Sequence, residues 1–376
     1  MENKPLTSIR GFAALWVVIH HLGSSVGISA LAFQLGYTAV DLFFILSGMI
    51  LASVYSHLSF GDAGLFWLKR VCRVYPAHWV SLIGLCFIFS YPAWTLAALQ
   101  NLFLNWGFAA SALLLQPFLS RQLLANPVAW SVGIELFCYF LFPLAIIFVR
   151  RLAPLRSAAI ALAVLLVIEW VVLRTYIGDT HGVGAVCRGL AGFGVGMLLW
   201  RVGSGLRLTA RGATLFEVMG LLGMAGGIAM NRPELIPLWS ASLLFGLSFD
   251  RGLLARGLHV KWCFWLGNIS FSMYLLHYPL ALATDKWLPV TLFPGNPVLI
   301  AWLRFSLLLA VILIMSALSY RFIETPGRRI PALLRDKLQR KQKKKPVKDI
   351  TSSGLAELLA LKPMPDTDRK PSGRQN

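Results

Sequence analysis

Arg10 and His21 combine the residue types and the spacing of a functional pair within one apolar segment. Arg10 opens the segment, and His21 follows eleven residues later. Eleven residues advance an α-helix by about three turns, or about 16 Å, and return to nearly the same side. We therefore predict that both side chains share one face, with the guanidinium at a membrane surface and the imidazole buried below it. An ionisable side chain inside a membrane-spanning helix indicates a function. The ring of His20 is turned about 100° away and faces other surroundings.

Six ionisable side chains are predicted at a similar depth in the outer half of the membrane. They are His21, Asp41, Glu135, Arg188, His277 and Arg304. A histidine oriented by a carboxylate is the usual construction of a general base, which makes His21 with Glu135 a catalytic candidate.

A structural role competes with catalysis at most of these positions. Asp41, Arg188 and Arg304 fit a buried ion-pair network that holds the helices together as well as they fit a catalytic role. His277 precedes Pro279 closely, and a packing histidine is the favoured interpretation there.

A second group of cations lies between two apolar segments, at Arg70 and Arg73. If this stretch is helical, side chains three residues apart share a face and form a pair suited to phosphate groups. Anchoring of the chain at the membrane surface explains these arginines equally well.

The composition predicts a multi-pass membrane protein. Of the 376 residues 57% are hydrophobic and 14% are charged, whereas a soluble domain carries about a quarter charged residues. We predict an all-α bundle of about ten transmembrane helices, because ten apolar stretches are each about long enough to cross a bilayer. They span residues 11–29, 38–55, 75–93, 129–149, 157–174, 185–202, 213–230, 236–250, 263–281 and 298–320. The stretch 96–118 is apolar enough to lie in the interface or to re-enter the membrane.

The distribution of basic residues predicts the orientation. With a cytoplasmic N-terminus, four inside connections carry clusters of Lys and Arg, and the opposite connections carry few. Both termini are then cytoplasmic. We expect a transmembrane domain over 1–330 and a basic, disordered cytoplasmic tail over 331–376, which is attracted to anionic lipid headgroups.

Several other functions lack their sequence signals. The five cysteines form no C-x-x-C pair, so neither a zinc site nor another metal site is expected. Phosphate-loop and dinucleotide motifs are missing. The basic tail lacks the interleaved aromatic residues of a nucleic-acid interface. The G-x-x-x-G from Gly192 to Gly196 predicts close helix packing.

The order of several short motifs resembles the bacterial integral-membrane acyltransferase-3 family, from residue 6 to about residue 330. The matching segments are Ile9–Leu15 with His21, Gly36–Gly48, the Arg70-x-x-Arg73-x-x-Pro76 stretch, Trp130–Glu135, Leu266–Pro279 and Ser319–Pro326.

This resemblance implies an O-acyltransferase of the bacterial inner membrane. Acyl-CoA, most simply acetyl-CoA, would be the donor substrate with no resident cofactor, and a surface polysaccharide or lipid-linked glycan would be the acceptor. Arg70 and Arg73 would hold the CoA phosphates, and the pantetheine arm would pass Arg10. His21 would take the proton of the acceptor hydroxyl, with Glu135 or Asp41 orienting it.

The resemblance leaves parts of the chemistry open. Ser131, Tyr274 or a buried arginine would stabilise the oxyanion. A two-step route with the acyl group carried transiently on His21 is equally consistent. Three alternatives remain: a transporter or flippase, a scaffold of a polysaccharide-export complex, and acylation of a small-molecule acceptor.

Overall fold

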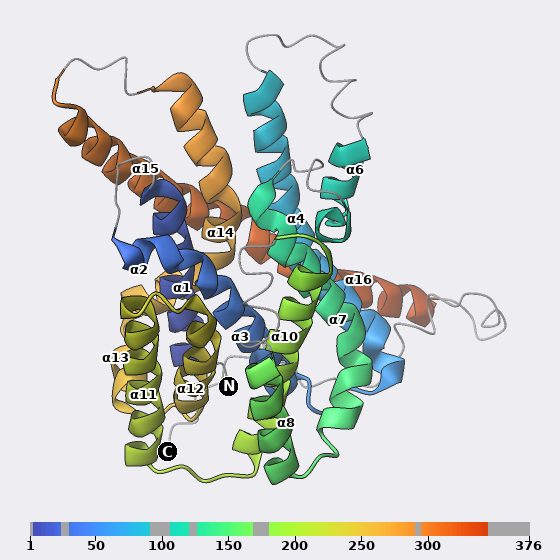
Figure 1. Ribbon diagram of the computed structural model, residues 1–376. Coiled ribbons are helices and arrows are strands. Elements are labelled where there is room, and N and C mark those ends of the chain that lie inside the picture. Colours follow the sequence, from blue (N-terminus) through green and yellow to red (C-terminus); the bar gives the residue numbers. More distant parts are fainter. Residues whose placement is uncertain are drawn as a thin grey trace, which may run out of the picture.

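The computed structural model describes residues 3–23, 30–90, 106–119, 126–167, 180–289 and 295–344. These residues form helices and no β-strand, which confirms the all-α prediction (Figure 1). The helices are α1 (Lys4–Gly23), α2 (Leu31–Gln34), α3 (Ala39–Val54), α4 (Ala63–Ser90), α6 (Trp106–Ala112), α7 (Trp130–Val149), α8 (Pro154–Val167), α10 (Gly182–Ser204), α11 (Ala210–Ala229), α12 (Ile236–Ser248), α13 (Leu253–Gly257), α14 (Lys261–Trp287), α15 (Pro297–Ser319) and α16 (Thr325–Lys344).

Six helical stretches in the described part of the chain are long and apolar enough to cross a membrane. They are Leu31–Val54, Phe60–Ile88, Pro127–Val149, Gly182–Ser204, Ala210–Ala229 and Pro297–Lys337. Each of the ten predicted apolar segments overlaps a helix, and the total of about ten spans stays a prediction. Of the stretch 96–118, residues 106–112 form α6, and residues 96–105 lie outside the described residues.

Two helices begin earlier than the apolar pattern predicted. Helix α1 begins at Lys4, so Arg10 lies within it and His21 lies in its last turn. Helix α4 begins at Ala63, so Arg70 and Arg73 lie inside a helix rather than in a connection between spans. Polar residues continue a helix wherever their backbone hydrogen bonds are formed, and hydropathy alone does not detect these extensions.

The predicted G-x-x-x-G contact joins α3 to α10. A side chain at Gly196 would overlap the carbonyl oxygen of Ile45, and one at Gly192 would meet Phe44. Across the same contact, a side chain at Gly48 would overlap the carbonyl oxygen of Phe193. The glycines therefore let two backbones approach closely, as small residues do in membrane helix pairs.

Helices α1 and α14 lie side by side and run in the same direction. Near their starts, a side chain at Gly267 would overlap the carbonyl oxygen of Thr7. Further along, the rings of His21 and His277 lie 5.0 Å apart. This parallel arrangement agrees with the predicted topology, in which both helices run from the inside to the outside.

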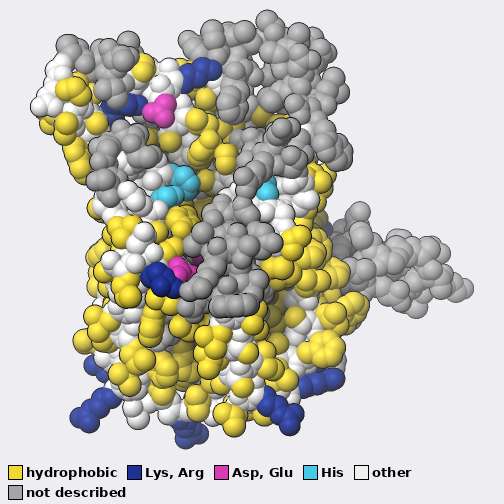
Figure 2. All heavy atoms as spheres, viewed as in Figure 1, with side chains coloured by type: hydrophobic (Ala, Val, Ile, Leu, Met, Phe, Trp, Pro, Cys, Tyr) yellow, Lys and Arg dark blue, Asp and Glu magenta, His cyan; other side chains and the backbone are white. Residues whose placement is uncertain are grey.

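Apolar side chains cover the sides of the molecule, and basic side chains line its lower edge (Figure 2). Helices α7 and α10 end at this edge, and α8 and α11 begin there (Figure 1). The connections at this edge contain Arg150, Arg151 and Arg207. The arrangement agrees with the predicted orientation and with a multi-pass membrane protein.

The predicted disordered tail is wrong for residues 331–344, because α16 continues through them to Lys344. Helix α16 packs on α4, and a side chain at Gly327 would crowd Pro76 and the carbonyl oxygen of Cys72. Packing on a neighbouring helix stabilises a helix that its composition alone would not. Residues 345–376 lie outside the described residues.

Candidate active site

Arg70 and Arg73 lie in helical register on α4, as the phosphate-binding prediction requires. Arg70 donates a hydrogen bond of 3.0 Å to the hydroxyl of Tyr55, and its guanidinium lies 5.3 Å from the centre of that ring. Its Nε atom is buried and has no partner among the described residues. Arg73 is half-buried and forms no ion pair with a described residue. Both arginines therefore keep hydrogen-bond donors available for an anion.

Arg10 joins this group from α1. Its Nε donates to the hydroxyl of Ser270 over 2.9 Å, and a terminal nitrogen donates to the carbonyl oxygen of Gly267 over 3.0 Å. These bonds to α14 fix the guanidinium, which lies close enough to Arg73 and Arg328 to interact electrostatically with both. Three cations therefore face one region between α1, α4 and α16.

Two carboxylates neutralise only part of this positive charge. Glu324 is fully buried, accepts bonds from the backbone N–H and the hydroxyl of Ser272, and forms an ion pair of 2.8 Å with Arg328. Glu135 also lies within electrostatic range of Arg10. With Arg70 and Arg73 included, four arginines surround two carboxylates. The excess of positive charge suits a polyanionic ligand.

Sequence reasoning missed Arg328 and Glu324 as members of this cluster. Their spacing of four residues within a helix is a recognisable ion-pair signal. Glu324 lies within the last of the family-like motifs, Ser319–Pro326, and Arg328 follows this motif by two residues.

Glu135 has other partners than the predicted imidazole. It accepts hydrogen bonds from the hydroxyls of Ser47 and Tyr139, the latter over 2.5 Å. No hydrogen bond joins it to His21 within the described part of the chain. It belongs to the arginine cluster instead, because α7 packs mainly on α10 and α4 rather than on α1.

His21 lies in the last turn of α1 and its side chain is exposed on the protein, so the burial of the imidazole below the membrane surface stays a prediction. The described part of α1 ends at Gly23, and residues 24–29 of the predicted span lie outside the described residues. The Nδ1 atom of His21 lies 3.0 Å from the carbonyl oxygen of Val17. A carbonyl only accepts, so Nδ1 carries the hydrogen and the lone pair of the neutral ring is on Nε2. This tautomer can accept a proton from a substrate hydroxyl.

The shared face of Arg10 and His21 is confirmed by their contacts with one helix. Arg10 bonds to Ser270 of α14, and the His21 ring lies beside His277 of the same helix. His20 instead contacts the carbonyl oxygen of Phe33, at 3.1 Å from Nδ1, as its different direction predicts. Helix α1 thus carries the Arg10 guanidinium, at the arginine cluster, and the His21 imidazole about 16 Å apart along its axis.

Asp41 is not placed to orient His21, because it forms a bidentate ion pair with Arg188. The two contacts measure 2.5 and 2.7 Å, and both side chains are buried between α3 and α10. The guanidinium also lies 5.8 Å from the centre of the Trp130 ring. This is the structural interpretation weighed for these residues.

We expect Asp41→Asn to destabilise the fold by about 3–5 kcal/mol, since it leaves the Arg188 charge buried and unpaired. The measurement is the thermal unfolding midpoint of the detergent-purified protein. The control is Asp285→Asn, which breaks the ion pair of 3.0 Å to Arg304 at a side chain that is 61% exposed; there we expect less than about 1 kcal/mol. An Asp41→Asn protein with normal stability and no activity would assign Asp41 to catalysis instead.

Ser131 and Tyr274, two candidates for oxyanion stabilisation, bond to each other over 2.7 Å. Tyr274 donates its hydroxyl hydrogen to the carbonyl oxygen of Val128 over 2.8 Å, so Ser131 donates to Tyr274. In this arrangement neither hydroxyl hydrogen is available to an oxyanion.

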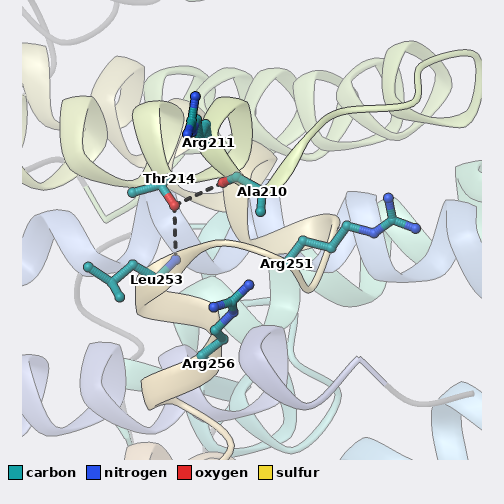
Figure 3. Close-up of a pocket in the computed structure, with 6 residues that line it drawn as sticks. All are labelled: Ala210, Arg211, Thr214, Arg251, Leu253 and Arg256. Carbon is teal, nitrogen blue, oxygen red and sulfur yellow. Dashed lines mark hydrogen bonds between the residues drawn. The ribbon is translucent and has the colours of Figure 1, made fainter.

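A cavity of about 330 Å³ lies elsewhere, between the start of α11 and α13. Its lining includes Arg211, Arg251 and Arg256, and at its edge Thr214 accepts a hydrogen bond from the backbone N–H of Leu253 over 3.1 Å. Figure 3 shows Arg251 extending away from the other residues and Arg211 on the opposite side of Thr214 from Arg256. The guanidinium groups do not converge, and the arginines fit the positive-inside pattern.

The chain matches the family described as an acyltransferase domain over residues 4–321. YrhL of Bacillus subtilis, provisionally named a peptidoglycan O-acetyltransferase, is 28% identical over 372 residues, covering 86% of this chain and 54% of YrhL. The O-acetyltransferase OatA of Staphylococcus aureus is 24% identical over 365 residues, covering 86% of this chain and 57% of OatA. The acyltransferase MdmB of Streptomyces mycarofaciens is 34% identical over 179 residues, covering 43% of this chain and 45% of MdmB.

The chain spans about half the length of these curated relatives, and no solved structure matches it. The family match nevertheless includes nearly the whole helical bundle, from the start of α1 to the end of α15. The matched range contains Arg10, His21, Arg70 and Arg73. The chain therefore belongs to the acyltransferase-3 family of membrane acyltransferases.

Proposed function

We propose that this protein transfers an acyl group, most simply acetyl, from cytoplasmic acyl-CoA to a hydroxyl of an extracytoplasmic surface glycan. The observation that carries the proposal is the arrangement along α1, where Arg10 joins an arginine cluster and His21 presents a basic nitrogen three turns further on. Relatives named as O-acetyltransferases support the acetyl group, and the peptidoglycan named for YrhL supports a glycan acceptor. The bacterial inner membrane is the location that this reaction requires.

The donor would bind with its phosphates at the arginine cluster. Arg70 and Arg73 supply unpaired donors on one face of α4, and Arg10 and Arg328 add positive charge beside them. The pantetheine arm would then extend along α1 towards His21. The reach between the two groups, about 16 Å along the helix, is a distance that an extended arm can cover.

Transfer would follow general base catalysis at His21. Nε2 of His21 takes the proton from the acceptor hydroxyl as its oxygen attacks the thioester carbonyl carbon. The carbon–sulfur bond then breaks, the acyl group stays on the acceptor oxygen, and the CoA thiolate takes the proton from the imidazolium. The hydrogen bond from Nδ1 to Val17 keeps a hydrogen on Nδ1, so that Nε2 is the atom that takes and returns the proton.

The test compares cells that lack the gene with cells that carry the wild-type protein. We expect mass spectrometry of the surface glycans to show an O-acetyl group only where the protein is present. In parallel, membrane vesicles with the purified protein should release free CoA thiol from acetyl-CoA only when glycan from the deletion cells is added. Unchanged glycans together with no thiol release would contradict the proposal, and acetylation of a small molecule alone would favour the small-molecule alternative.

A further inference from the structure

His277 of α14 is a buried imidazole with one nitrogen that no described residue satisfies. Its side chain is fully buried, and Nδ1 lies 3.3 Å from the carbonyl oxygen of Met273. Because that oxygen only accepts, Nδ1 carries the hydrogen and Nε2 carries a lone pair. Nε2 is buried and has no hydrogen-bond partner in the described part of the chain. A buried acceptor without a donor is costly and requires an explanation, of which a ligand or a role in function is one.

The surroundings of His277 belong to the proposed active site. Its ring lies 5.0 Å from the ring of His21 and 5.9 Å from the ring of Tyr274. Tyr274 gives its hydroxyl hydrogen to the carbonyl oxygen of Val128, so this neighbour does not donate to Nε2. The lone pair therefore lies beside the proposed base, without a donor among these neighbours.

We propose that Nε2 of His277 accepts a hydrogen bond from the glycan acceptor, from an O–H or N–H group next to the hydroxyl that is acylated. The inference rests on the proposed function and adds a second contact to it. It describes the acceptor as a sugar in which a hydrogen-bond donor, a hydroxyl or an acetamido N–H, lies beside the acylated oxygen. His21 then takes the proton of the reacting hydroxyl, and His277 accepts a hydrogen bond from the adjacent O–H or N–H group of the sugar.

The position of His277 along α14 favours the acceptor over the CoA donor. Arg10, at the arginine cluster, is held by Ser270, which lies seven residues before His277. Seven residues correspond to about two turns, or about 10 Å along the helix. His277 thus lies at the level of His21, where the acceptor hydroxyl reacts, and away from the cations proposed to bind the phosphates.

The test uses a matched pair of substitutions, His277→Gln and His277→Asn. A glutamine oxygen reaches near the position of Nε2 and preserves an acceptor there, whereas an asparagine amide reaches only the position of Nδ1. We expect His277→Asn to raise the KM for glycan about tenfold, and His277→Gln to stay within about threefold of wild type. The KM for acetyl-CoA should not change in either variant. Initial rates are measured in vesicles with purified full-length protein and glycan from the deletion cells, each substrate varied separately.

The outcomes separate this inference from the function it rests on. If wild type transfers no acetyl group to glycan, the proposed function fails, and the inference fails with it. If wild type is active and both variants match it, only the inference fails. Equal losses in both variants, with equally lowered unfolding midpoints, would make His277 a packing residue. A raised KM for acetyl-CoA in His277→Asn would assign the contact to pantetheine and would also overturn the inference.

Discussion

Replacing His21 with alanine is expected to lower the acetyl-transfer rate about 1,000-fold while leaving membrane insertion and stability unchanged. General base catalysis contributes about 100- to 10,000-fold to such reactions, and the proposed mechanism has no second group that takes the proton. His21 is exposed in the last turn of α1, so the truncation leaves no large cavity. The measurement is the rate of CoA thiol release in vesicles, together with the O-acetyl content of cells at matched protein levels.

His20→Ala is the matched control for this substitution. His20 is adjacent in sequence but faces Tyr37, at 5.7 Å between ring centres, and the carbonyl oxygen of Phe33. We expect its loss to change the rate by no more than a few fold. Full O-acetyl content in cells with His21→Ala would favour the scaffold alternative, because a scaffold does not depend on the imidazole.

The double substitution Arg70→Gln with Arg73→Gln is expected to raise the KM for acetyl-CoA about 100-fold or more. Each charge-assisted hydrogen bond to a phosphate contributes roughly 1.5–3 kcal/mol, and two are lost. With acetyl-pantetheine, which lacks the nucleotide phosphates, wild type and the double variant should have the same KM. Steady-state rates with the two donors measure this difference directly.

Arg151→Gln with Arg156→Gln is the control, because it removes the same charge from exposed residues on the same predicted inside face. Equal effects of the two pairs would mean that overall surface charge, rather than a phosphate site on α4, determines the affinity. An unchanged KM for acetyl-CoA in the Arg70 and Arg73 variant would refute the phosphate assignment.

Features within a single helix were predictable from the sequence. The helical repeat is a local property of the backbone. It places Arg10 and His21 on one face of α1, and Arg70 and Arg73 on one face of α4. The close approach at Gly192 and Gly196 was also readable, because small residues four apart leave room for a neighbouring helix.

Contacts between helices were not predictable in the same way. Glu135 was expected beside His21, yet it bonds to Ser47 and Tyr139, and the neighbour that His21 has instead is His277. Helix α7 begins at Trp130, within one residue of the predicted start at 129, so the difference lies in lateral placement: α1 packs mainly on α14 and α3, whereas α7 packs mainly on α10 and α4.

The sequence by itself determined the helical class, the order of the family motifs and the shared faces of Arg10 with His21 on α1 and of Arg70 with Arg73 on α4. These depend on hydropathy, charge and the period of one helix. Only the tertiary structure decided which charges neutralise one another, as Asp41 and Arg188 do. It also decided that the Nε2 lone pair of His277 lies beside His21. Partners across helices depend on the height, tilt and rotation of each helix, and the packing of the whole bundle sets these together.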